Sequence, residues 1–138
     1  MEASPVVFAS RAGIRLELTL APSPYTGLRE WLVRATGEGL DARVTAEEAG
    51  WFPEFLDSSL TRKAGAPTSD EESWYSASHE LRLRVSQPKA NTVVVVATLS
   101  FQGPPLWTTE IVIELDPGAF DQAAAEARQE AVRVPLTD

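Results

Sequence analysis

Apolar and polar residues alternate along most of the length of this chain, and this pattern limits the folds open to it more than any other. In residues 14–20 the even positions are Ile, Leu, Leu and Leu, and the odd positions are Arg, Glu and Thr. Such a period of two is typical of a strand with one face in the core and the other in solvent. The pattern predicts strands at 6–9, 14–20, 31–36, 40–46, 81–85, 92–101 and 107–115.

Two other segments follow helical spacing. The first has apolar residues at 51, 52, 55, 56 and 60 and predicts a helix over about 52–61. The second begins at Asp116-Pro117, an N-cap followed by a first-turn proline, and continues with a stripe at 120, 123, 124, 127 and 131. Together these elements predict an α+β fold, in which two helices pack on one face of a curved antiparallel sheet of about seven strands.

Length and composition indicate a single domain over residues 1–138, with no internal repeat. Apolar residues make up 43% of the chain and charged residues 23%, as in ordinary globular proteins. Residues 62–73, with Gly65, Pro67 and an acidic run, are expected to form a mobile loop. The longest apolar run, 93–97, is far shorter than a membrane span. With no secretory signal evident, the expected location is the cytoplasm and no membrane partner is expected.

The net charge indicates which partners to expect. The chain carries 12 basic and 20 acidic residues, a formal charge of -8. Residues 1–40 are neutral overall, so the whole excess lies in residues 41–138. Because contacts to nucleic-acid phosphates need clustered Lys and Arg, this chain is not expected to bind nucleic acid. An acidic surface instead favours a basic protein partner.

Reactive side chains are scarce. There is no cysteine and only one histidine, His79. Because His79 shares the parity of Leu81 and Leu83, we expect it on or near the inner face, as a structural residue rather than as a base or ligand. The carboxylate pairs lie on predicted helix surfaces or in the loop. Solvated carboxylates at such positions are not expected to act as general acids or bases. We therefore expect no catalytic residue, no metal and no cofactor.

The acidic excess and the aromatic residues indicate candidate partner contacts. Trp74 directly follows the acidic run and is either a core anchor at the start of a strand or an exposed hot spot, because Trp and Tyr are frequent in interface hot spots. The predicted contacts are the carboxylates of the first helix and of the loop, together with this tryptophan: Glu54, Asp57, Asp70, Glu71, Glu72 and Trp74.

A second candidate surface lies on the outer side of the predicted sheet. If alternate residues of 92–101 point inward, Val94 and Val96 point outward beside Val112. Arginines 82 and 84 flank this stripe on one neighbouring strand, and glutamates 110 and 114 on the other. The stripe is either a solvated sheet face with cross-strand pairs or a docking surface, including a homodimer face.

Several of these residues carry a resemblance to known families. The stretch Trp74-x-Ser76-x-x-x-Glu80-Leu81-x-Leu83 resembles a motif in a family of small actinobacterial proteins of unknown function. The excess of Arg over Lys, 10 to 2, also fits a bacterial source with a GC-rich genome. The layout is similar to the WapI-type immunity proteins of bacterial toxin systems: paired strands with Trp31-Leu32-Val33, a helix, three strands and a closing helix. The resemblance implies a fold and a class of function, and it implies no catalytic residue.

Three functions follow as hypotheses. The first is a non-enzymatic immunity protein that neutralises a basic bacterial toxin through its acidic surface, since an inhibitor needs only a complementary surface. The second is a structural or adaptor module that self-associates through an edge strand or the valine stripe. The third is an enzyme or small-ligand binder with a cavity between the sheet and the helices, with His79 and nearby aromatic residues as its first candidates.

Overall fold

The computed structural model describes residues 5–10, 12–22, 29–48, 68–76, 79–101, 103 and 106–133. In this part of the chain the elements are the strands β1 (Val6–Ala9), β2 (Arg15–Pro22), β3 (Arg29–Gly37), β4 (Leu40–Glu48), β5 (Thr68–Tyr75), β6 (Leu81–Lys89), β7 (Thr92–Phe101) and β8 (Trp107–Leu115), and the helix α2 (Pro117–Arg133). All seven predicted strands and the predicted closing helix are present. The helix predicted over about 52–61 lies outside the described residues.

The strands form two sheets rather than one. Sheet A has the order β1-β2-β3-β4 and sheet B the order β5-β6-β7-β8, and every pair is antiparallel. The predicted single sheet of about seven strands with two helices is therefore wrong: the described fold is mostly β, with one helix. Alternation specifies which face of a strand is buried, and it is the same whether the next strand joins the same sheet or a second one.

The eighth strand, β5, replaces part of the predicted mobile loop. Residues 68–75 pair with β6, and the register shifts between Thr68 and Glu72. The acidic run at 70–72 has a low intrinsic propensity for strands and so predicts a loop. Intrinsic strand propensity depends strongly on context, however, and the pairing with β6 overrides it here. As an edge strand of sheet B, β5 carries charged side chains of the kind that discourage pairing with another chain.

The two sheets are built alike, a repeat that the sequence does not reveal. In each, a serine after the first strand caps the turn into the second: Ser10 Oγ accepts the Ile14 N–H at 3.1 Å, and Ser76 Oγ accepts the Leu81 N–H at 3.0 Å. Backbone bonds from these serines to the same residues close both turns. The inner faces also correspond row by row: Leu16, Ala35 and Ala42 with Leu83, Ala97 and Ile111, and Leu18, Val33 and Val44 with Val85, Val95 and Ile113.

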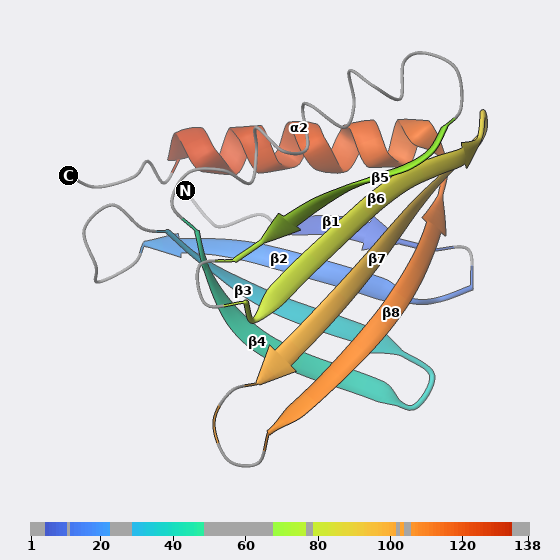
Figure 1. The fold of residues 1–138 in the computed structure, drawn as a ribbon. Coiled ribbons are helices and arrows are strands. Elements are labelled where there is room, and N and C mark those ends of the chain that lie inside the picture. The colour runs from blue at the N-terminus through green and yellow to red at the C-terminus, as the bar shows by residue number, and fades with distance from the viewer. Residues whose placement is uncertain are drawn as a thin grey trace.

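The core lies between the inner faces of the sheets and under helix α2. Figure 1 shows the strands of sheet B crossing those of sheet A, with α2 along one side. The helix contacts β1 and β7, and the sheets meet where β1 nears β8 and β4 nears β7. Phe120 on α2 is fully buried, its ring centroid 6.1 Å from that of Phe8 on β1. The helix alanines 123, 124 and 127 are also fully buried, and their small side chains let the helix lie close to the strands.

Candidate functional site

The outer side of sheet B carries an apolar stripe that we call the valine face, made of Val94, Val96 and Val112. The register pairs Val96 on β7 with Val112 on β8. Val94 lies two residues before Val96 on β7 and therefore points to the same side of the sheet. Val112 is 48% exposed, and the other two are half-buried. The structure therefore brings together the three residues that the sequence predicted for this surface.

Charged side chains border the valine face on both sides. On β6, Arg84 pairs with Val96, and its Nη2 lies 3.0 Å from the Glu110 carboxylate on β8. The Arg84 guanidinium also lies 4.0 Å from the carboxylate of Glu71 on β5. It therefore pairs with one carboxylate on each edge strand of sheet B. Glu110 additionally accepts a hydrogen bond from the Thr98 hydroxyl at 3.4 Å. Glu114 is exposed beside Val94.

An aromatic and cationic cluster lies at the end of the same face. The Arg82 guanidinium carbon lies 5.1 Å from the centroid of the Tyr75 ring, and the rings of Tyr75 and His79 are 5.0 Å apart. Tyr75 is 45% exposed. The Nε atoms of Arg82 and Arg84 are buried and have no hydrogen-bond partner within the part of the chain that the structure describes. Tyr and Arg are residue types that concentrate binding energy at interfaces.

His79 lies outside the core, contrary to the sequence prediction. It is exposed in the turn between β5 and β6, with a φ of 63°. The matching turn between β1 and β2 has Gly13 at the corresponding place, with a φ of 87°. Strand parity cannot place His79, because the chain leaves the extended strand geometry in this left-handed turn. The left-handed conformation is energetically unfavourable for a residue that has a Cβ.

Trp74 belongs to the core rather than to a contact surface. It is 6% exposed and pairs with Leu83 on the inner face of sheet B. Because side chains alternate along a strand, burial of Trp74 turns Tyr75 outward. Trp74 therefore has little exposed surface with which to contact a partner. The motif that begins at Trp74 is accounted for structurally, since Ser76 caps the turn and its hydroxyl donates to Glu80 Oε1 at 3.1 Å.

The predicted acidic contacts are only partly brought together. Glu71 is exposed on the outer side of β5 and reaches Arg84, whereas Glu72 is half-buried and pairs with Val85. Asp70 lies on β5, and its side chain is outside the described part of the structure. Glu54 and Asp57 are outside the described residues. The acidic groups that border the valine face are instead Glu71 on one edge strand, and Glu110 and Glu114 on the other.

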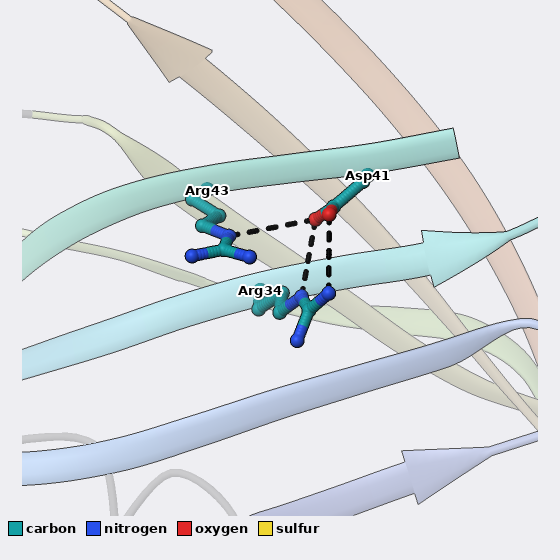
Figure 2. Close-up of polar contacts among 3 residues, drawn as sticks. All are labelled: Arg34, Asp41 and Arg43. Atoms are coloured by element: carbon teal, nitrogen blue, oxygen red, sulfur yellow. Dashed lines mark hydrogen bonds and ion pairs between the residues drawn. The ribbon is translucent and has the colours of Figure 1, made fainter. Parts of the chain in front are cut away.

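The outer side of sheet A carries a compact charged cluster at the hairpin of β3 and β4 (Figure 2). Arg34 donates from Nε and Nη2 to the two carboxylate oxygens of Asp41, both at 3.1 Å, and Arg43 Nε lies 3.5 Å from the same carboxylate. Gly39, with a φ of 74°, provides the left-handed residue of this turn. One carboxylate thus orients two guanidinium groups, and the cluster has a formal charge of +1.

Hydrogen bonding within this cluster shifts the pKa values of both Asp41 and Arg34. The bond from Arg34 is the main reason that the pKa of Asp41 lies below its ordinary value of 3.8; burial opposes the shift and Arg43 adds to it. The same hydrogen bond raises the pKa of Arg34. Because the folded pKa of Asp41 is lowered, its stabilising contribution is present above the unfolded pKa and is lost as pH falls through the folded one.

Titration of the Asp41 carboxyl by carbon NMR checks this account. We expect its midpoint below 3.8 in the wild type, and a rise toward 3.8 in Arg34→Gln, because that variant removes the largest cause of the shift. Arg43→Gln removes a smaller cause and should raise the midpoint less. A larger rise in Arg43→Gln than in Arg34→Gln would contradict the assignment.

Other features of the described residues bear on the remaining hypotheses. Helix α2, the helix they contain, lacks the length and apolarity needed to cross a membrane. Among the same residues, no group of three or more His, Asp or Glu side chains is arranged to hold a metal ion. A groove of about 630 Å³ lies over the outer side of sheet A, not between a sheet and the helix as the third hypothesis predicts.

Comparisons with known protein families, with curated proteins and with solved structures found no match for this chain. The resemblance to a family of unknown function and to the WapI-type immunity proteins therefore stays a prediction.

Sequence reasoning missed the role of Tyr75 and the cluster on the hairpin of β3 and β4. Alternation from a buried Trp74 would have turned Tyr75 outward, but this required β5 to be recognised as a strand. Arg34, Asp41 and Arg43 lie on polar positions of two predicted strands. Their alternation with apolar neighbours signalled a solvent face, whereas the ion pairs depend on the register.

Proposed function

We propose that this chain is a non-enzymatic binding protein that uses the valine face to bind a basic protein partner, as an immunity protein binds a toxin. The observation that carries this proposal is the exposed Val112 on β8 beside Val94 and Val96 on β7, with carboxylates on both edge strands of the sheet. An apolar centre with a charged rim is the usual composition of a protein interface. The carboxylates and the net charge of -8 favour approach of a basic partner.

The bordering residues fit the same proposal. Tyr75 and Arg82 extend the face with side chains of the hot-spot types, and their mutual contact limits the side-chain entropy lost on binding. Glu71, Glu110 and Glu114 outnumber Arg82 and Arg84, and Arg84 is already paired. The proposal assigns this activity to the cytoplasm, where an immunity protein would meet a toxin that acts inside the cell.

The test combines co-expression with a substitution at Val112, the most exposed residue of the valine face. The products of the two genes adjacent to this one are expressed with and without the chain, and growth and co-purification are measured. We expect one product to be toxic alone and to be neutralised by the wild type. Val112→Arg should weaken binding by about tenfold or more and abolish rescue, because it adds a desolvated cation that repels a basic partner.

Leu32→Arg is the matched control for that experiment. Leu32 is 48% exposed, as Val112 is, but it lies on the outer side of the other sheet. We expect Leu32→Arg to bind and rescue like the wild type. Absence of a toxic or co-purifying neighbour product, or full rescue by Val112→Arg, would overturn the proposal.

Self-association through the valine face is the second candidate function. The specific observation is that β6 carries Arg82 and Arg84, β8 carries Glu110 and Glu114, and the valines of β7 lie between them. A two-fold axis that runs parallel to β7, between two copies whose valine faces meet, would set the arginines of one copy over the glutamates of the other, an isologous arrangement. Light scattering at high concentration should then give a dimer that Val96→Lys dissociates, and a strict monomer would exclude this function.

A further inference from the structure

The groove over the outer side of sheet A has properties that the proposed function does not use. Its volume of about 630 Å³ lies within the range of about 300–1,000 Å³ that is typical of small-molecule sites. The floor is the outer side of β2, β3 and β4, and the wall comes from Glu80, just before β6, and from Phe101 and Gly103 at the end of β7. A hydrogen bond of 2.8 Å from the Ser100 N–H to the Glu80 carbonyl joins the two parts of that wall.

Two apolar side chains face this groove although they are accessible to solvent. Leu32 on the floor is 48% exposed, and Phe101 on the wall is 40% exposed. The Phe101 ring is held in position, stacked against Trp107 with the centroids 6.1 Å apart and the planes 19° apart. Gly103 also lies close to this ring and leaves room for it, since a Cβ there would lie only 3.0 Å from the ring Cζ. The groove therefore presents an ordered apolar wall opposite an apolar part of the floor.

Of the two arginines that line the groove, Arg43 keeps both terminal nitrogens free of partners in the part of the chain that the structure describes. Arg34 uses Nε and Nη2 on Asp41, whereas Arg43 uses only Nε. The terminal nitrogens of Arg43 carry no contact in Figure 2, and they have no partner within the described residues. Asp41 orients the Arg43 guanidinium without occupying those donors, which match the two oxygens of a carboxylate.

The carboxylates that line the groove limit what charge it accepts. Glu17 is paired with Arg15, and Glu80 accepts a hydrogen bond from Ser76 at 3.1 Å. Carboxylates at these two positions would repel a second negative charge on a ligand. The lining thus favours one anionic group beside an apolar body and disfavours a dianion.

We propose that this groove binds a small organic acid, with one carboxylate on the terminal nitrogens of Arg43 and an apolar chain between Leu32 and Phe101. The site is separate from the valine face, so either proposal can fail while the other holds. Selectivity for a monoanion follows from Glu17 and Glu80, and selectivity for an apolar chain follows from the fixed Phe101 ring.

Amide NMR titrations of the whole chain with three probes of equal chain length test the proposal: octanoate, octyl phosphate and 1-octanol. We expect octanoate to cause saturable shifts at Leu32, Arg43 and Phe101. Octyl phosphate and octanol should bind at least about tenfold more weakly than octanoate. Arg43→Gln should weaken octanoate binding about tenfold without altering the fold, because the Arg43 side chain is 68% exposed. Phe101→Ala should weaken octanoate and octanol equally.

Lys89→Gln is the matched control, since Lys89 is an exposed cation at the end of β6 in the other sheet. It should bind octanoate like the wild type. The proposal is overturned by an absence of saturable shifts at millimolar octanoate, by shifts spread over residues that do not line the groove, by equal binding in Arg43→Gln, or by octyl phosphate or octanol binding as tightly as octanoate. Val112→Arg should leave octanoate binding unchanged, which keeps this result independent of the partner experiment.

Discussion

Trp31→Ala should lower the free energy of unfolding by about 3–5 kcal/mol, the largest loss that we expect from a single substitution in this protein. Trp31 is fully buried, and it is the largest of the fully buried side chains in the described core. It lies on β3, a central strand of sheet A, and pairs with Leu20 on one side and Ala46 on the other. Truncation leaves a cavity that these neighbours cannot fill without moving two strands.

Urea denaturation followed by far-UV circular dichroism measures this loss, which corresponds to roughly 10–20 °C in Tm for a domain of this size. Leu32→Ala is the control, because Leu32 is the next residue on the same strand and is 48% exposed on the opposite face. Its cost should stay below about 1 kcal/mol. Trp31→Phe should fall between the two. Equal losses at positions 31 and 32 would contradict the assigned faces of β3.

Phe120→Ala should cost about 3–4 kcal/mol and loosen helix α2 selectively. Phe120 is fully buried against Phe8 on β1, and the other buried apolar residues of the described helix are the alanines 123, 124 and 127. Since an alanine buries little apolar surface, most of the hydrophobic stabilisation of the helix depends on this one ring. Its removal should free α2 before the sheets unfold.

Hydrogen exchange resolves that order of events. In Phe120→Ala the amides of α2 should exchange well before those of β3 and β7, whereas in the wild type the difference should be smaller. Val132→Ala on the same helix is the control, because Val132 is 82% exposed and should change stability by no more than about 0.5 kcal/mol. Protection of α2 that is as strong in Phe120→Ala as in the wild type would contradict this role of the ring.

The candidate surfaces show which part of a site alternation can predict. Val94, Val96 and Val112 were placed on one outer face because each lies on the polar parity of its strand, and the register sets them together as predicted. The same rule failed for Trp74 and His79. Trp74 is buried because β5 pairs with β6, and His79 is exposed because it sits in a left-handed turn where parity no longer applies.

Seven strands, their buried faces and the closing helix can be predicted from the amino-acid sequence, because burial period and capping residues are local properties of a chain. The division of the strands into two sheets, the pairing of the acidic segment 68–75 as a strand and the position of Asp41 between two arginines are visible only in the folded chain. Those outcomes depend on which strand edges pair and in which register, and residues distant in the chain settle that pairing together.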